Sequence, residues 1–238
     1  MPAKGTDQRR RYHRPPMPAD TDPVAIVRRR ARTILDRLAR RYPEIHTALD
    51  YRHPWELLVS TVLSAQTTDE NVNGVTPILF ERWPTAVDLA NANPEEVERV
   101  VFSTGFYRQK TASLIALSRD LVDRFGGEVP QDLDALTTLR GVGRKTASVV
   151  LAEAFGLPAI AVDTHVQRVA RRLALTIEDA PEKIEADLRA LYAQSRWSGI
   201  SMRFIQFGRE VCDARKPRCW ECSLADLCPY PNKTPPPA

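Results

Sequence analysis

A lysine and an aspartate stand near the starts of two consecutive predicted helices. Lys145 falls in the first turn of an apolar helix predicted over residues 144–155. Asp163 directly precedes a second helical pattern that begins at Thr164. A lysine amine can attack a sugar carbon as a nucleophile, and an ionised carboxylate stabilises positive charge on the reacting sugar. Together the two residues indicate lyase chemistry on DNA.

Each of these residues also has an ordinary structural interpretation. Lys145 can be interpreted as an ordinary solvated surface lysine. The helix N-terminus and the neighbouring Arg144, however, favour the neutral, nucleophilic form of its amine. Asp163 is a common residue type for a helix N-cap, and capping would keep its carboxylate ionised. Chain geometry permits the pairing, because a helix over residues 144–155 rises ~16 Å, and residues 156–162 span up to ~23 Å when extended. We therefore expect the two helix starts to lie side by side.

Gly141, Val142 and Gly143 separate two helical patterns and predict a tight hairpin. Glycine tolerates positive φ and lets a partner approach the backbone closely. Free amides in the hairpin and at the following helix start carry partial positive charge, so they can bind a phosphate without any side chain. Arg140 and Arg144 flank the hairpin and add charge. We expect these five residues to contact DNA; the alternative is a plain turn between two core helices.

All four cysteines of the chain, Cys212, Cys219, Cys222 and Cys228, lie in one short segment. Such clustering indicates one site rather than disulfides spread over a fold. Structural zinc is the main alternative, because four thiolates satisfy it fully. Zinc sites usually have two CxxC pairs, and only Cys219 and Cys222 have that spacing, so we favour a [4Fe-4S] cluster. Trp220, between two ligands, is expected to shield the cluster.

Three cations, Arg215, Lys216 and Arg218, lie between the first two cysteines. A charged segment of this kind is commonly a solvated surface loop. Here a cysteine ligand at each end would hold the loop rigid, and a rigid basic loop suits DNA phosphates. We expect these three side chains to contact DNA.

The composition is typical of a helical globular protein, with 43% hydrophobic residues, 27% charged residues and only 10 glycines. No apolar run is long enough to span a membrane. Residues 1–14 hold five basic residues and one aspartate, which account for the whole chain's formal net charge of +4. The remainder is formally neutral, so its DNA affinity must come from how charge is distributed. We expect residues 1–23 to form a disordered basic extension and residues 230–238 a disordered tail.

Apolar residues recur at helical spacing along most of the chain. The predicted helices include residues 24–41, 54–64, 69–82, 107–125, 144–155, 181–194 and 201–211. Asn93 and Pro94 predict a further helix start, through a cap followed by a proline in the first turn. No strand pattern competes convincingly. The predicted fold class is all-α.

Four motifs, in this order, make the sequence resemble the helix-hairpin-helix DNA glycosylases and, within them, the endonuclease III family. They are LSAQTTD at residues 63–69, the LxGVGRKTA hairpin at residues 139–147, AVDTH at residues 161–165 and the cysteine spacing. The resemblance covers about residues 24–229. It implies a bifunctional base excision repair enzyme that removes oxidised pyrimidines such as thymine glycol, then cuts the abasic strand by β-elimination.

The resemblance also implies roles for single residues. Lys145 attacks the sugar C1′ to form a Schiff base, and Asp163 assists departure of the base. Gln66 fills the gap left when the target nucleotide is flipped out of the duplex. The second inserted side chain falls at Phe106, where leucine is more usual in the family, and Arg140 stands where proline is common.

A two-lobed helix-hairpin-helix DNA glycosylase fold follows from the same resemblance, with DNA and the flipped base between the lobes. A six-helix barrel domain that contains the hairpin covers residues 47–157. An iron-sulfur cluster domain combines residues 24–46 with residues 158–229. The sequence by itself indicates only one or two domains.

Other function classes use only part of these features. A non-catalytic helix-hairpin-helix DNA-binding protein would need the hairpin but not the pair of Lys145 and Asp163, and an electron carrier would need only the cysteines. A monofunctional glycosylase remains open within the enzyme class. The bifunctional enzyme explains all the motifs together. Its expected partner is double-stranded DNA with damaged pyrimidines or abasic sites, and we expect a monomer without membrane contact, cytoplasmic and nucleoid-associated if the source is bacterial.

Overall fold

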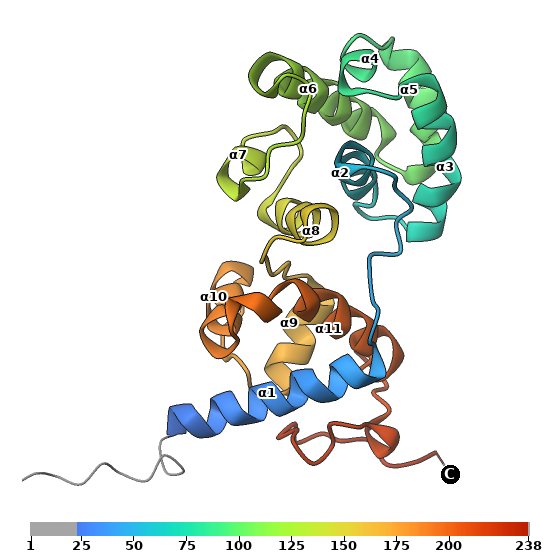
Figure 1. Cartoon of the computed structure of the whole chain (residues 1–238). Helices are drawn as coiled ribbons and strands as arrows, with labels where there is room; N and C mark the ends of the chain where they lie inside the picture. Colours follow the sequence, from blue (N-terminus) through green and yellow to red (C-terminus); the bar gives the residue numbers. More distant parts are fainter. Residues whose placement is uncertain (1–22, 238) are drawn as a thin grey trace, which may run out of the picture.

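The computed structural model describes residues 23–237 (Figure 1). In chain order the helices are α1 (Pro23–Arg41), α2 (Pro54–Leu63), α3 (Asp69–Arg82), α4 (Ala86–Ala90), α5 (Pro94–Val101), η1 (Phe102–Thr104), α6 (Tyr107–Phe125), α7 (Leu133–Thr137), α8 (Arg144–Phe155), α9 (Thr164–Arg172), α10 (Pro181–Leu191), η2 (Gln194–Arg196), α11 (Ser198–Glu210) and η3 (Cys219–Glu221). These residues contain no β-strand, which confirms the all-α prediction. In the same range, no helix is long and apolar enough to cross a lipid bilayer. The basic extension expected over residues 1–23 lies outside the described residues, except for Pro23, where α1 begins.

Buried apolar side chains form two large clusters. The first is built by α2 to α8 and runs from Leu49 to Ala159. The second joins α1 to α9, α10 and α11. In Figure 1, α2 to α8 occupy the upper part of the molecule, and the helices of the second cluster lie below them. We propose that these two lobes are the barrel domain, residues 47–157, and the cluster domain, residues 24–46 with 158–229.

The first lobe holds seven α-helices, where six were expected. Two of the seven, α4 and α7, have only five residues each. The start of α4 is fixed by a capping box, in which the Thr85 hydroxyl accepts from the Asp88 N–H and the Asp88 carboxylate accepts from the Thr85 N–H. The five residues of α4 have too few turns to show an apolar period, so the sequence pattern does not predict this helix.

The first helix, α1, packs in the second lobe although the chain passes next to the first. Its buried apolar side chains are Ala31, Ile34, Leu35 and Leu38. The Arg30 guanidinium also donates to the Leu173 carbonyl at 2.6 Å and to the Leu227 carbonyl at 3.1 Å. Contacts so distant in sequence make the second lobe discontinuous along the chain.

A third, small apolar cluster joins the two lobes. It contains Val149 from α8, Ala161 from the segment before α9, and Met202 from α11. The neighbouring residues Val150 and Leu151 pack instead in the first lobe. Since α8 has buried side chains on both sides, its position is set by both lobes.

The C-terminal segment packs on the cysteine-rich loop, in contrast to the disordered tail expected over residues 230–238. The Arg172 guanidinium lies over the Tyr230 ring, 4.7 Å from the ring centroid. The Thr234 hydroxyl accepts a hydrogen bond from the Cys219 N–H at 3.3 Å. The expectation rested on the proline content of the segment, which does not predict these side-chain contacts.

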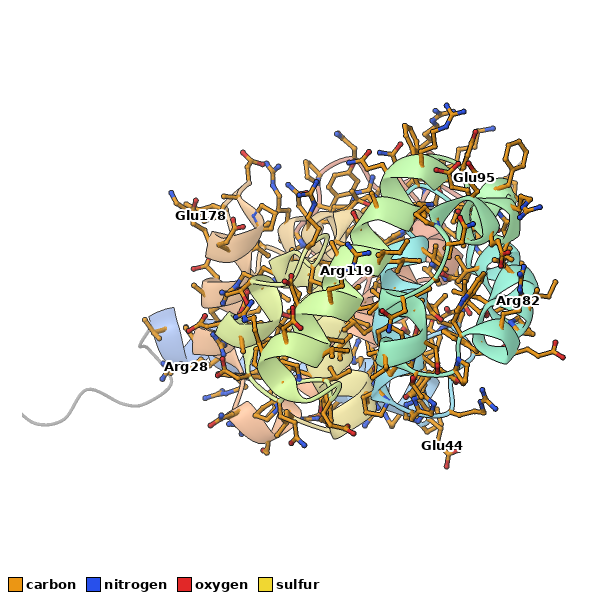
Figure 2. All side chains as sticks on the ribbon, turned by 90° about the horizontal axis from the view of Figure 1, so that it is seen from above. Arg28, Glu44, Arg82, Glu95, Arg119 and Glu178 are labelled. Carbon is orange, nitrogen blue, oxygen red and sulfur yellow. The ribbon has the colours of Figure 1, made fainter. Side chains whose placement is uncertain are left out.

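Charged side chains of both signs cover the outside of the molecule. In Figure 2, labelled charged residues of both signs, among them Glu44, Arg82 and Glu178, lie far apart on the molecule. Arg82 is paired with Glu96 at 2.6 Å. On such a mixed surface, attraction for an anionic partner depends on where cations without carboxylate neighbours gather.

Candidate active site

Lys145 and Asp163 line one cavity between the two lobes. Lys145 extends from the start of α8, and Asp163 is the last residue before α9. The apolar side of the cavity includes Val149, Met202 and Ile205, which belong to the cluster that joins the lobes. Its position between the lobes makes it the candidate pocket for a reacting group. The expected approach of the two helix starts is therefore present in the structure.

Lys145 is exposed in the first turn of α8. The helix has Gly143 at its N-cap, which offers no side chain to bond the first amides. Buried Ala147 and Val150 on the same helix fix its position against the first lobe. The Lys145 amine is consequently held at the mouth of the cavity by a rigid element, in contact with solvent and accessible to a reacting group.

Asp163 caps α9. Its Oδ1 atom accepts a hydrogen bond from the Val166 N–H at 2.8 Å, and the residue is half-buried. This hydrogen bond satisfies one of the free N–H groups at the start of α9. The second carboxylate oxygen is left to interact with positive charge in the cavity, so capping and charge stabilisation are compatible.

His165 lies two residues after Asp163, in the first turn of α9. Burial lowers the pKa of His165, an effect that the nearby Asp163 carboxylate partly opposes. The His165 Nδ1 atom is 3.0 Å from Nη2 of Arg168. A Cβ added at Gly208 of α11 would come within 3.2 Å of His165, so the two helices pack closely at this point. His165 therefore packs against α11 and contacts Arg168.

An ion pair between the lobes forms part of the cavity wall. Arg209 of α11 pairs with Asp69, the first residue of α3, at 3.2 Å. Both residues line the cavity with Lys145 and Asp163. The sequence pattern places Asp69 only at a helix start and does not single out Arg209. Their proximity depends on packing between residues 140 positions apart, although the position of Asp69 in the LSAQTTD motif was an available signal.

The segment that links the lobes also borders the cavity, and α8 holds it in place. The Glu153 carboxylate accepts a hydrogen bond from the Thr47 N–H at 2.8 Å. The Tyr51 hydroxyl donates to the Glu153 carbonyl at 3.0 Å. Residues 45–49 therefore have a fixed path past the candidate nucleophile.

The two hairpin glycines have different structural requirements. Gly141 has a φ of +80°, and a Cβ there would lie 3.0 Å from the Ser113 Cβ. Gly143 has a φ of −87°, and a Cβ there would meet nothing within 4 Å. The fold thus demands glycine at position 141 but not at 143. Open space above Gly143 and the adjoining helix amides is what a bound phosphate requires.

Two of the hairpin residues expected to contact DNA are engaged inside the protein. The Val142 side chain is buried in the first lobe, and its N–H donates to the Leu139 carbonyl at 3.1 Å. The Arg144 guanidinium donates to Glu185 of α10 at 2.6 and 3.0 Å. Val142 is therefore a core residue because its side chain faces inward, and Arg144 joins the lobes because a buried carboxylate faces it. Arg140 is exposed.

Gln66 and Phe106 border a second cavity, which Gly141 of the hairpin also lines. Both have left-handed backbone conformations, with φ of 57° and 48° respectively. Phe106 is 61% exposed, and Gln66 is exposed as well. Non-glycine residues in this conformation are strained, and such strain is concentrated at functional sites. The structure thus brings together both side chains assigned to DNA insertion.

The four cysteines line a single cavity and form no disulfide. Each of them is half-buried. In residues 23–237, no group of three or more histidine, cysteine or acidic side chains is arranged to hold a single metal ion. The four thiols therefore face one shared cavity, where they can act together as ligands of one cofactor.

Hydrogen bonds and packing surround these sulfurs. Arg172 of α9 donates to the Cys212 sulfur at 3.4 Å, and the Leu224 N–H donates to the Cys222 sulfur at 3.4 Å. Tyr230 lines the cavity, whereas Trp220 does not and is 41% exposed. The aromatic side chain that borders the cavity is thus Tyr230 of the C-terminal segment, not Trp220.

The basic loop after Cys212 is braced internally. The Asp213 carboxylate accepts from the N–H groups of Arg215 and Lys216, both at 2.8 Å. Arg218 pairs with Glu221 at 2.9 Å, which reduces its availability to a phosphate. Arg215 and Lys216 are exposed. Two of the three cations predicted to contact DNA, Arg215 and Lys216, are therefore exposed on a loop that internal hydrogen bonds hold in place.

Comparisons with known proteins agree with this geometry. Residues 59–194 match the HhH-GPD superfamily of base excision DNA repair proteins. Residues 212–228 match the iron-sulfur binding domain of endonuclease III. Endonuclease III of Synechocystis is 50% identical over 207 residues, which cover 87% of this chain and 94% of that protein. The chain belongs to the endonuclease III family. Endonuclease III of Bacillus subtilis is 43% identical over 82% of this chain and 89% of its own length.

Solved structures of endonuclease III are also similar to this chain. A non-covalent complex of endonuclease III with DNA aligns with a TM-score of 0.81 at 44% identity, over 85% of this chain and 95% of that chain. A trapped covalent intermediate of endonuclease III with DNA gives the same TM-score. As a member of the endonuclease III family, the chain is a DNA glycosylase and abasic-site lyase of base excision repair with an iron-sulfur binding domain. The resemblance stated from the sequence motifs is confirmed.

Proposed function

We propose that this enzyme removes oxidised pyrimidines, thymine glycol among them, from double-stranded DNA and cuts the strand through a Schiff base on Lys145. The observation that carries the proposal is the shared cavity of Lys145 and Asp163 between the lobes. The covalent intermediate trapped for a related endonuclease III supports the covalent route. The cavity combines an apolar side with charged groups, which suits a flipped base attached to its sugar.

In the proposed reaction, the neutral Lys145 amine bonds to the sugar C1′ while the glycosidic C–N bond breaks, and the departing base takes up a proton. The Asp163 carboxylate stabilises the positive charge that develops on the sugar. The nitrogen then loses a proton and the C1′–O4′ bond breaks, with O4′ taking up a proton, so that an imine forms on the opened sugar. This imine acidifies the C2′ proton. Loss of that proton breaks the C3′–O bond, and the phosphate leaves as the 5′-phosphate end of the downstream strand, after which water hydrolyses the imine and restores the lysine.

The hairpin and the basic loop are the proposed contacts with the DNA backbone. A phosphate would rest on the open side of Gly143 and the first amides of α8, with Gly141 fixing the turn and Arg140 nearby. Arg215 and Lys216 would bind a second stretch of backbone from the loop between cysteines. Such contacts position the duplex without reading its sequence.

Gln66 and Phe106 are the proposed inserted side chains. Both are exposed, strained and adjacent to one cavity that includes the hairpin. Flipping a nucleotide costs a few kcal/mol of stacking and pairing. An amide and an aromatic ring that enter the duplex from this side would offset part of that cost, with Phe106 stacking on the remaining base.

The proposed form of the iron-sulfur group is a [4Fe-4S] cluster held by Cys212, Cys219, Cys222 and Cys228. When bound, such a cluster would cross-link the loop through the four thiolates. The cysteine cavity shares no lining residue with the cavity of Lys145 and Asp163. Arg172 and Leu224 would direct N–H groups at its sulfur ligands. The loop that carries Arg215 and Lys216 would thereby be fixed at both ends.

Borohydride trapping tests the proposal directly. The intact enzyme is incubated with a duplex that carries one thymine glycol, and with a duplex that carries an abasic site, alongside Lys145→Gln. We expect a covalent adduct on both duplexes and none with the variant. An adduct on the abasic duplex alone would contradict the proposed base specificity. Absence of any adduct despite binding would mean a monofunctional glycosylase or a non-catalytic DNA-binding protein.

Because the substrate is chromosomal DNA, we further propose that the enzyme acts as a monomer at the nucleoid, in the cytoplasm of a bacterial cell. The relatives from Synechocystis and Bacillus subtilis are bacterial proteins, which supports this assignment. Light scattering of the purified enzyme with and without DNA checks the monomer, and a constant dimer mass would exclude it.

A further inference from the structure

Lys110 is a buried lysine that the proposed reaction does not use. It belongs to α6 and is only 5% exposed. Its Nζ atom donates to the Leu63 carbonyl at 2.8 Å and to the Thr104 carbonyl at 2.7 Å. Burial lowers the pKa of Lys110. A lysine is rarely buried without a carboxylate partner, so its amine needs a specific reason to be there.

The two carbonyls bonded by Lys110 belong to the two loops with strained backbones. Leu63 ends α2, three residues before Gln66, and Thr104 ends η1, two residues before Phe106. Of the three non-glycine residues with positive φ in residues 23–237, Gln66 and Phe106 are the two in this lobe. The Lys110 amine therefore holds the backbone just before Gln66 and just before Phe106.

Asn71 connects the same two loops independently. Its side-chain amide donates to the Thr67 hydroxyl at 2.8 Å and to the Ser103 carbonyl at 2.8 Å. The Ser103 hydroxyl donates back to the Asn71 amide oxygen at 3.1 Å. Asn71 comes from α3, whereas Lys110 comes from α6. Side chains from two different helices thus bridge one pair of loops, which a simple turn would not require.

We infer that Lys110 is a positioning residue, which together with Asn71 joins the two loops so that Gln66 and Phe106 enter the duplex as one rigid unit. The inference rests on the proposed insertion of these two side chains. Joined loops keep both side chains in place before DNA arrives, so little conformational freedom is lost on binding. Loops that moved separately would have to be ordered while the nucleotide is being flipped.

The role of Lys110 is confined to extruding a nucleotide from a paired duplex. Its amine is occupied by the two carbonyls and lies beneath the loops, so it acts through Gln66 and Phe106. An abasic site in single-stranded DNA needs no extrusion. The ratio of the rate on damaged duplex to the rate of strand cleavage at a single-stranded abasic site isolates this step from Schiff-base chemistry.

The experiment compares the intact enzyme with Lys110→Met and Asn71→Ala. We expect each variant to lower the duplex-to-single-strand ratio, with Lys110→Met lowering it by on the order of tenfold or more, as a displaced positioning contact does. A 2-aminopurine opposite the damaged base reports insertion by its fluorescence, and its rise on binding should be slower in both variants. Should Lys110→Met fail to fold, Asn71→Ala, which alters a partly exposed side chain, carries the test.

Three further variants separate the possible outcomes. Ser118→Ala is the control on the same helix. The buried Ser118 hydroxyl donates only to the Leu114 carbonyl, so its removal should leave the duplex-to-single-strand ratio unchanged. Gln66→Ala and Phe106→Ala test the proposed insertion itself. If Gln66→Ala and Phe106→Ala alter the ratio but Lys110→Met and Asn71→Ala do not, the positioning role of Lys110 is overturned, while the insertion roles of Gln66 and Phe106 stand. A normal ratio in all four would overturn the insertion roles as well, and an altered ratio in Ser118→Ala would reduce the Lys110 effect to general destabilisation.

Discussion

Arg144 donates two hydrogen bonds to Glu185, at 2.6 and 3.0 Å, and so fastens the first turn of α8 to α10 in the other lobe. Glu185 is 5% exposed and is also 3.3 Å from Arg189. The residue next to Arg144 is Lys145, the proposed nucleophile. The ion pair therefore controls where the amine lies relative to the carboxylate of Asp163.

Glu185→Ala should affect stability and strand cleavage together. The change removes the carboxylate that pairs with Arg144 and Arg189. Because both arginines are partly exposed, the cost should be below that of breaking a fully buried pair, and we expect a loss of about 1–3 kcal/mol in the free energy of unfolding. Strand cleavage should fall more than DNA binding. Urea unfolding and single-turnover cleavage measure the two effects, and unchanged cleavage would separate Glu185 from the positioning of Lys145.

The hairpin glycines should respond differently to alanine. Gly141→Ala places a Cβ in a left-handed conformation 3.0 Å from Ser113, so we expect a loss of about 1–2 kcal/mol in stability. Gly143→Ala adds a methyl group in open space and should leave the melting temperature unchanged while weakening DNA binding. Thermal unfolding and fluorescence anisotropy with a labelled duplex distinguish the two. If Gly143→Ala bound DNA with normal affinity, the proposed phosphate contact at Gly143 would be excluded.

Asp163→Asn separates capping from catalysis. The asparagine oxygen can accept the same hydrogen bond from Val166, so the free energy of unfolding should change by less than ~1 kcal/mol. Base removal should slow by on the order of 10² to 10³, because the negative charge that faces the reacting sugar is lost. Asp163→Ala is the control, since it loses both the cap and the charge. Equal base removal by Asp163→Asn and the unaltered enzyme would exclude an electrostatic role.

Local sequence signals were sufficient for much of the candidate site. Lys145, Asp163 and the hairpin lie close together in the chain, and helix caps, glycines and apolar spacing are short-range features. The four cysteines are equally local. In each case the chemistry of a few neighbouring residues determined the prediction, and the three-dimensional arrangement only had to bring two helix starts together.

Residues that act through long-range packing were not predicted. Glu185 is 41 positions from Arg144, and Arg209 is 140 positions from Asp69, so no local pattern connects them. Lys110 did leave a signal. It stands on the same helix face as Leu114, Leu117 and Leu121, all fully buried, and a lysine in that apolar series indicates a buried amine with a fixed partner.

Acid should reduce stability partly through His165. Burial lowers the pKa of His165 below its ordinary value of 6.5, so the unfolded chain takes up the proton more readily than the folded one. The contribution of the neutral imidazole is therefore complete above about pH 6.5 and is lost as the pH falls below that value. Urea midpoints measured at about pH 7.5 and about pH 5.5 should differ less for His165→Gln than for the unaltered enzyme. Equal differences would assign the acid sensitivity to other groups.

The C-terminal segment should protect the iron-sulfur group. Tyr230 and Lys233 line the cysteine cavity, and the Lys233 amine donates to the Ala225 carbonyl at 2.8 Å. Removal of residues 230–238 should speed cluster loss to a chelator by on the order of tenfold, followed by visible absorbance, because outer contacts of a metal site contribute that much to its affinity. Tyr230→Phe keeps the ring over Arg172 and should be nearly normal, whereas Tyr230→Ala should resemble the truncation. If the truncated enzyme keeps its absorbance as long as the full chain, the contacts of the segment contribute nothing to retention, and the half-buried cysteines alone protect the cluster.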